Sequence, residues 1–189
     1  SVSASGAMKL SGDSAAMASV KGVSVEAGES VVVRGQTASV SGTEGVTVST
    51  DKDASVSAAG ELSMSTGSFG ASASGDASMS AGKAMKVEAT ESMSVSGESV
   101  SISGDDGVSM DSSGPASVTG QTATLDGEAG VSVVSDKGDA SVSGEAVSVS
   151  ASGAMKLSGD SAAMASVKGV SVEAGESVVV SCLLYTSDA

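Results

Sequence analysis

Apolar and polar residues alternate along most of this chain. In SMSVSGESVSISG, residues 92–104, nearly every apolar residue is followed by a serine. Successive side chains of a β-strand leave opposite faces, so the alternation predicts strands with Val100 and Ile102 pointing inward and Ser94 and Ser101 outward. Glycines and acidic residues interrupt the strands every seven to nine residues and are typical of tight turns. The chain is therefore predicted to be a series of strand-and-turn units.

The same unit recurs from one end of the chain to the other. The segment around Ala15 to Val20 is less regular, and Met17 is its expected inward residue. Elsewhere the inward pairs expected from the alternation are Met8/Leu10, Val23/Val25, Val31/Val33, Ala38/Val40, Val46/Val48, Ala54/Val56, Leu62/Met64, Ala71/Ala73, Ala77/Met79, Met85/Val87, Val108/Met110, Ala116/Val118, Ala123/Leu125, Val131/Val133, Ala140/Val142 and Val147/Val149.

A longer repeat lies over the short one. Residues 1–33 recur without a change at residues 148–180, an offset of 147 residues. Self-similarity at a fixed period is the signature of solenoids and other repeat arrays. The offset is not a whole number of two-unit or three-unit turns, so we expect the duplication to have moved units between chemically equivalent faces.

The energetics of one unit favour stacking. A unit buries two medium-sized apolar side chains, which is too little to offset the conformational entropy of ordering its backbone. Stacked as parallel strands, units share hydrogen bonds and a continuous core. We therefore predict an all-β fold, a β-solenoid of strand-turn units that forms one continuous array over residues 1–180. Two units per turn, three units per turn and an intertwined trimer all remain open.

Two other structural classes compete with this prediction. The serine, glycine and acidic content suggests a disordered low-complexity linker, but the mean hydropathy of +0.21 opposes it. A helix suits Ala84 to Ala89 locally, yet glycine at every seventh or eighth residue and the Val-Ser-Val runs favour strands.

The C-terminal tail differs from the array. The repeat stops at Val180, and residues 181–189 read SCLLYTSDA. Cys182 to Ala189 resembles the translation of a transposon-type sequencing adapter, so we expect residues 181–189 to be a non-native or disordered tail. The chain also begins in the middle of a unit at Ser1, which leads us to expect a fragment of a longer protein.

Composition and charge limit the partners. The formal net charge is −14, and the nine basic residues are scattered singly. Nucleic acids and anionic membranes are polyanions that need clustered Lys and Arg, so we expect neither as a partner. No apolar run is long enough to span a bilayer, so we expect no membrane insertion. Self-association along or around the solenoid is the partner that we expect, with no small-molecule substrate.

No catalytic or cofactor site is expected. The chain has no His, and its single Cys, Cys182, lies in the tail, so a Ser-His-Asp or Cys-His site cannot be assembled. The serines are expected at outward strand positions. We therefore expect no enzyme activity, no catalytic or metal-binding residues and no cofactor. The acidic pairs are interpreted as turn residues and not as glycan-cleaving or calcium sites: Asp51/Asp53, Asp105/Asp106 and Asp136/Asp139.

An ice-binding solenoid needs threonine at alternate outward positions on successive turns. Thr122 and Thr124 form the only Thr-x-Thr in the chain. This function is therefore ranked low.

Residues 93–105, MSVSGESVSISGD, and residues 136–153, DKGDASVSGEAVSVSASG, carry a family resemblance. They resemble the repetitive β-helical spike segments of contractile phage tails and type VI secretion spikes, and equally the solenoids of bacterial surface adhesins. The resemblance implies a trimeric needle in the first case and an extracellular or cell- or virion-surface location in both. We expect a non-enzymatic rod in an extracellular fibre or adhesin, with the needle as the alternative.

The tail gives a first testable prediction. Deleting Cys182 to Ala189 should leave the melting temperature of the chain unchanged, because the tail lies outside the repeat. Thermal unfolding followed by circular dichroism measures this. A loss of several degrees would show that the tail packs on the solenoid.

Overall fold

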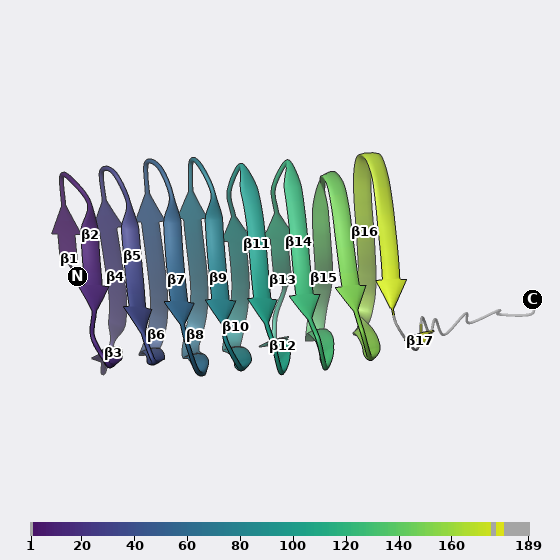
Figure 1. Cartoon of the computed structure of the whole chain (residues 1–189), viewed down its shortest axis with the longest axis horizontal. Helices are drawn as coiled ribbons and strands as arrows, with labels where there is room; N and C mark the ends of the chain where they lie inside the picture. Colours follow the sequence, from purple (N-terminus) through teal and green to yellow (C-terminus); the bar gives the residue numbers. More distant parts are fainter. Residues whose placement is uncertain (1, 175–176, 180–189) are drawn as a thin grey trace, which may run out of the picture.

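The computed structural model describes residues 2–174 and 177–179, and its side chains are described as far as residue 158 and at Ser161. Every regular element in this part of the chain is a β-strand. The strands stack side by side into a parallel β-solenoid of about seven turns (Figure 1). The all-β solenoid expected from the sequence is therefore confirmed, and the described residues form strands where the alternatives were disorder and helix. The prediction about residues 181–189 lies outside the described residues.

Three strands make one coil, and equivalent strands of successive coils pair to form three long faces. Face A contains β1 (Val2–Ala4), β4 (Gly22–Ala27), β13 (Ala116–Thr119) and the later parts of β6 (Thr37–Thr50), β8 (Leu62–Ala73) and β10 (Ala84–Ser96).

Face B contains β2 (Met8–Ser11), β5 (Val31–Gly35), β7 (Ala54–Ala58), β9 (Ala77–Ala81), β11 (Ser99–Gly104) and β14 (Thr122–Gly127). Face C contains β3 (Ser14–Ser19), the earlier parts of β6, β8 and β10, then β12 (Gly107–Ser112) and β17 (Ser177–Val179). The long strands β15 (Gly130–Ala151) and β16 (Ala154–Ala174) pass through all three faces.

The pairing register fixes the length of one coil. On face A, Val2 pairs with Val25 and Val25 pairs with Val48, so the two steps are equal. The step lengthens by one position where Ala38 pairs with Leu62 on face C. Between two paired residues the chain passes through all three faces, so one coil holds three strand-turn units. This register answers the question that the sequence left open.

The inward side chains of the three faces meet in one continuous core. Val100 is 2% exposed and Ile102 is fully buried, whereas Ser94 and Ser101 are exposed. The predicted polarity of this stretch is therefore confirmed. The inward positions on face B form a ladder of residues that are all 7% exposed or less: Val33, Val56, Met79, Ile102 and Leu125.

The least regular segment was predicted incompletely. Ala15 is 2% exposed, whereas Met17 is only partly buried and packs against the edge of the core. Phe69, which the alternation did not single out, is 3% exposed and stacks between Val46 and Met93 on face A. Both residues have a register partner in the next coil, Ala38 for Ala15 and Val40 for Met17.

The corners differ from the uniform tight turns that were expected. The strands β6, β8 and β10 run from face C to face A without ending, and the register shifts where they bend. Asp136 and Asp139 lie in the same kind of bend within β15 and not in a turn. An extra residue in one strand lets the backbone change direction while pairing continues on both sides.

At other corners glycine is required because a side chain would not fit between successive coils. A Cβ atom at Gly82 would collide with the carbonyl oxygen of Ala59 in the preceding coil. The backbone amide of Gly82 donates a hydrogen bond to Ala58 O at 2.9 Å. The close approach of the two turns therefore excludes a side chain at this position.

The duplicated sequence occupies two different places in the coil. Met8 lies on β2 and belongs to face B, whereas its copy Met155 begins β16 on face C. The copy is thus rotated by one face about the solenoid axis. The expectation that the duplication moved units between equivalent faces is confirmed.

The burial of Val100 and the exposure of Ser101 predict that substitution by aspartate will lower stability strongly at one position and hardly at the other. Val100→Asp places an unpaired carboxylate in the core and should lower the free energy of unfolding by about 3 to 5 kcal/mol. Ser101→Asp places the same group in solvent and should change it by less than about 0.5 kcal/mol. Urea denaturation of both variants measures the difference. Equal effects would contradict the inward and outward assignment.

Candidate functional site

Face B carries two parallel columns of small hydroxyl side chains. One column contains Ser55, Ser78 and Ser101, and the other runs two residues further along the same strands. Each of these serines is exposed or half-buried. Strands of one sheet are spaced by about 4.8 Å, so the columns form a regular grid of groups that both donate and accept hydrogen bonds.

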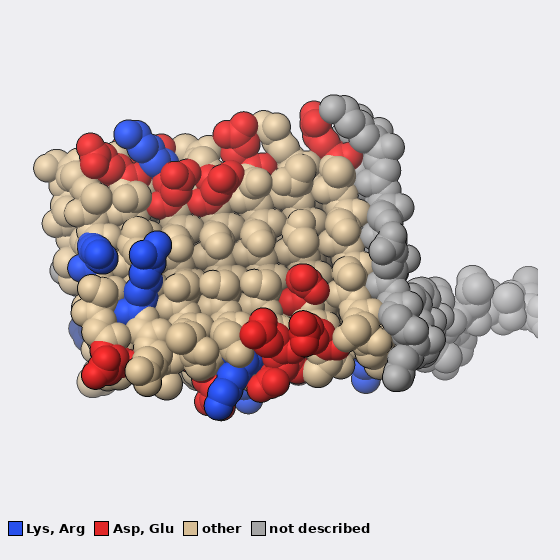
Figure 2. Space-filling view, in the orientation of Figure 1, with Lys and Arg blue, Asp and Glu red and all other residues tan. Residues whose placement is uncertain are grey.

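The grid is bounded by charges. In the orientation of Figures 1 and 2, β7, β9 and β11 run down the near side of the molecule. Figure 2 shows an uncharged band along this side between two rows of acidic side chains, with basic side chains towards the N-terminal coils. Lys9 and Arg34 are the exposed basic residues of β2 and β5, and Asp126 is the exposed acid of β14. The central coils of face B therefore present hydroxyl groups alone.

The acidic pair Asp51 and Asp53 lies at the corner between faces A and B. The Asp53 carboxylate accepts a hydrogen bond from the backbone amide of Asp76 in the next coil, at 3.0 Å. This contact ties two successive turns together. The carboxylate of Asp53 therefore has a structural partner, as the turn interpretation of this pair predicted.

The remaining acidic pairs lie at the other two corners. Asp105 and Asp106 follow β11, and the Asp106 amide donates to Lys83 O at 3.0 Å. Asp139, in the bend of β15, accepts a hydrogen bond from the Ser161 hydroxyl. Among the described residues, no three His, Cys, Asp or Glu side chains lie close enough together to hold a metal ion.

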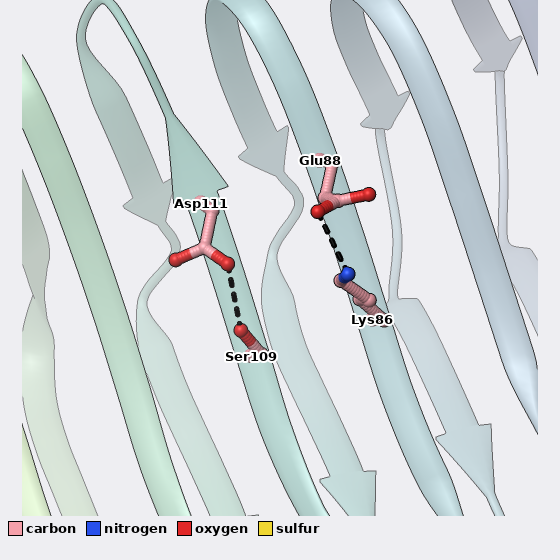
Figure 3. A network of polar contacts seen from close by, with 4 residues as sticks. All are labelled: Lys86, Glu88, Ser109 and Asp111. Carbon is pink, nitrogen blue, oxygen red and sulfur yellow. Dashed lines mark hydrogen bonds and ion pairs between the residues drawn. The ribbon is translucent and has the colours of Figure 1, made fainter.

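Face C carries a small polar network of charged side chains. The Lys86 ammonium lies 2.7 Å from the Glu88 carboxylate, and Ser109 donates a hydrogen bond to Asp111 at 3.0 Å on the next coil (Figure 3). The hydrogen bond and charge of Glu88, together with the charge of Asp111, raise the pKa of Lys86. An amine whose pKa lies above its ordinary value stays protonated at neutral pH, so Lys86 is a cation beside Glu88 and Asp111.

Four hydroxyl groups point into the core, contrary to the expectation that serines face outward. Thr50, Thr66, Ser112 and Ser135 are each 6% exposed or less. They occupy the third inward position of their strands, after two apolar residues, where the chain turns the corner. The i, i+2, i+4 spacing from the inward pairs is the sequence signal that would have identified them.

These corner hydroxyls satisfy backbone carbonyls where the sheet ladder is interrupted. The hydroxyl of Thr50 donates to Glu29 O at 2.7 Å, and the hydroxyl of Ser135 donates to Gly114 O at 2.8 Å. Both carbonyls belong to the preceding coil. Each of these hydrogen bonds joins a corner to the preceding coil, so these side chains stabilise the corners.

The cavities offer little to a ligand. An internal cavity of about 20 Å³ lies in the core beside Met64 and Phe69, and its walls are almost wholly apolar. A shallow open groove lies at the corner beside Arg34 and Gln36. A small-molecule site is normally a concave pocket of several hundred Å³ that encloses most of its ligand. The internal cavity is far smaller than this, and the corner groove, of about 450 Å³, is shallow and open to solvent.

The threonine pair of β14 was considered for ice binding. Thr122 and Thr124 are both exposed on face B, as an ice-binding ladder would require. Their register partners are Ser99 and Ser101 in the preceding coil and Ala146 and Ser148 in the following one. The threonine pair is therefore not repeated along the face.

Comparison with protein-family profiles, with curated proteins and with solved structures gives no match. Within the described part of the chain, no helix has the length and apolar character to cross a membrane. The fold and the surface chemistry therefore carry the functional argument.

The corner hydroxyls generate a prediction about stability. Ser135→Ala removes the donor to Gly114 O and should lower the free energy of unfolding by about 1 kcal/mol. Ser132→Ala, on the outward side of the same strand, should have almost no effect and serves as the matched control. Thermal and urea unfolding measure both. If Ser135→Ala is as neutral as the control, the buried hydrogen bond does not stabilise the corner.

Proposed function

We propose that this chain is a structural rod, a segment of an extracellular fibre or surface adhesin without enzymatic activity. The observation that carries this proposal is the continuous core, whose buried residues run from Ala15 to Met155. Each coil adds one strand to each of the three faces, and paired strands are spaced by about 4.8 Å along the axis. Such an architecture makes a stiff spacer whose length depends only on the number of coils.

The surface supports a passive role. The carboxylates of Asp53 and Asp139 and the corner hydroxyls of Thr50 and Ser135 have hydrogen-bond partners, and the outward face positions are mostly serine. Nucleophilic catalysis by a Ser-His or Cys-His site needs a histidine, and the chain has none. These features favour a spacer over an enzyme or a receptor for small molecules.

The extracellular location follows from the resemblance to adhesin and spike repeats. The charge of the chain is compatible with it, because a net charge of −14 keeps a long rod soluble and apart from other polyanions. The resemblance supports the location, and the stacked core supports the rod.

The alternative is the trimeric needle of a phage tail or type VI secretion spike. In an intertwined trimer three chains share each turn, whereas here three successive strands of one chain complete it. The core is filled by the three faces of the same chain. This observation favours the single-chain rod.

A coil deletion tests the spacer function. In a Cys182→Ser background, spin labels are attached at Ser24→Cys and Ser141→Cys, which lie five coils apart on face A. At about 4.8 Å per coil, electron paramagnetic resonance should measure a narrow distribution of label–label distances near 24 Å. Deleting residues 77–99 removes one coil and should shorten the distance to about 19 Å without unfolding the chain.

The control deletion removes residues 77–88, which is half a coil. It leaves the pairing among the later coils intact but breaks the register at the junction, so it should broaden the distance distribution instead of shortening the distance by one coil. A broad distance distribution in the full chain would contradict a stiff rod. A stable trimer in sedimentation experiments on dilute protein would favour the needle.

A further inference from the structure

Opposite charges lie at the two ends of one outward column on face B. Arg34 pairs in register with Ser57, and the column continues through Ser80 and Ser103 to Asp126, four coils from Arg34. Both charged side chains are exposed. Among the described residues, neither has an ion pair or a side-chain hydrogen bond. The column is therefore basic at one end and acidic at the other, with hydroxyl groups between them.

The corner between faces B and C repeats this arrangement beside the column. Gln36 follows Arg34 by two residues, Glu128 follows Asp126 by two residues, and both Gln36 and Glu128 are exposed. The open groove of about 450 Å³ beside Arg34 is lined by small residues such as Ala59, and no carboxylate belongs to its wall. In a chain with a net charge of −14, this end of face B thus offers hydrogen-bond donors and room for an acidic partner.

We propose that two copies of this chain pair side by side through face B, with their solenoid axes antiparallel. The two-fold axis runs along β9, so that the middle coil meets its own copy. Two coils to either side, Arg34 of each copy forms an ion pair with Asp126 of the other. The Gln36 amide of each copy donates a hydrogen bond to Glu128 of the other.

The hydroxyl groups between the charges suit such a contact. Ser57 of one copy faces Ser103 of the other, and Ser80 faces its own copy at the two-fold axis. Serine side chains are short, so the two sheets can approach closely, and each hydroxyl both donates and accepts hydrogen bonds. The strands of the two sheets are aligned, which is a common geometry of face-to-face packing. A contact of this kind is closed and isologous, as in most homodimers.

The antiparallel register keeps nearly all acids on this face apart. Counting coils from the two-fold axis, Asp53 faces Ser99 of the other copy, and Asp105 faces Ala59. Asp76, which directly precedes β9, is the exception and faces its own copy at the edge of the contact. Like charges opposite one another weaken association, so removing this charge should strengthen the dimer.

The other two faces lack this complementarity. In the described part of face A, the two outward columns that contain Ser24 and Glu26 hold one charged residue, Glu26 itself. On face C, Lys86 already has an ion pair with Glu88 of its own chain. Face B is therefore the face whose charges can fix both the orientation and the register of a second copy. The five coils involved are internal, so the contact does not depend on where the sequence begins or ends.

The area of the contact indicates how strong the dimer is. Five coils extend about 24 Å along the axis and their strands about 20 Å across it, which gives about 500 Å² on each copy. A total of about 1,000 Å² is at the lower limit for a specific interface, so we expect a reversible dimer at high protein concentration. The inference does not rest on the spacer function, because an unpaired rod keeps its length.

Sedimentation equilibrium over a range of concentrations tests the charge pairing. Arg34→Glu places two acids opposite each other and should raise the dissociation constant of the dimer at least about tenfold. Lys21→Glu makes the same change of net charge outside face B and should have little effect. Arg34→Asp combined with Asp126→Arg in one chain should restore the dimer, and Asp76→Asn should tighten it several-fold. All five sites are exposed, and circular dichroism verifies that each variant is folded.

Crosslinking tests the antiparallel register. Ser57→Cys and Ser103→Cys are placed in separate chains of different length, each with Cys182→Ser, and mixed with a short bismaleimide. The 57–103 heterodimer should exceed the 57–57 and 103–103 homodimers. Ser80→Cys should crosslink efficiently with its own copy, whereas Ser94→Cys, exposed on face A, measures chance collisions and should not.

A dimer that shows the 57–103 crosslink, is weakened by Arg34→Glu and is restored by the charge reversal supports the proposal. A chain that stays monomeric at every concentration would overturn it and leave the rod proposal standing, because the distance measurement is made within one chain. A dimer that is indifferent to Arg34→Glu, or that favours the 57–57 crosslink, would also overturn it.

Discussion

The structure depends on the stacking of each coil on its neighbours. A single coil buries a few medium-sized apolar side chains on each of its three faces, and its strands lack partners unless coils lie above and below it. Pairing of each strand with its equivalent in the next coil places inward residues over inward residues, which extends the core. The same pairing gives the backbone amides and carbonyls of each strand their hydrogen-bond partners. The core ladder of Met79, Ile102 and Leu125 is a direct result of this register.

The same register constrains the surface. An outward residue lies beside the outward residues of the neighbouring coils, so like charges on a face are brought close together. Glu88 and Asp111 are register partners on face C, and Lys86 beside them offsets their repulsion. Serine avoids the problem, and hydroxyl side chains accordingly fill the central columns of face B, while most acids lie at the corners (Figure 2). A surface built under this constraint suits a long stiff spacer better than a specific pocket.

Much of the fold could be predicted from the alternation alone. Pairs such as Met85/Val87 and Val131/Val133 are buried as expected, because a strand buried on one side has a strict two-residue period. The number of units per coil could not be predicted, because equivalent units give the same pattern for two or three per turn. Only the pairing register distinguishes these possibilities.

The corners were less predictable than the strands. Thr50 and Ser135 continue the inward period into the corner, where their hydroxyls bond carbonyls of the preceding coil. Those contacts depend on residues 21 positions earlier, so no local pattern reveals them. Asp136 and Asp139 lie in a bend within a continuous strand, which a sequence rich in Asp and Gly does not distinguish from a turn. The pairs Asp51/Asp53 and Asp105/Asp106 do lie in the connections between strands, as expected.

The central claim is that one chain completes each coil with three successive strand-turn units, and disulfide mapping from Ser55 on face B tests it most directly. Two double-cysteine variants are made in a Cys182→Ser background. Ser55→Cys with Ser78→Cys places cysteines one coil apart in the structure. Ser55→Cys with Gly70→Cys places them at positions that would be neighbours only in a coil of two units. We expect the 55–78 disulfide to form within single chains and the 55–70 disulfide to be absent. Formation of the 55–70 disulfide, or a 55–78 disulfide found only between chains, would contradict the account.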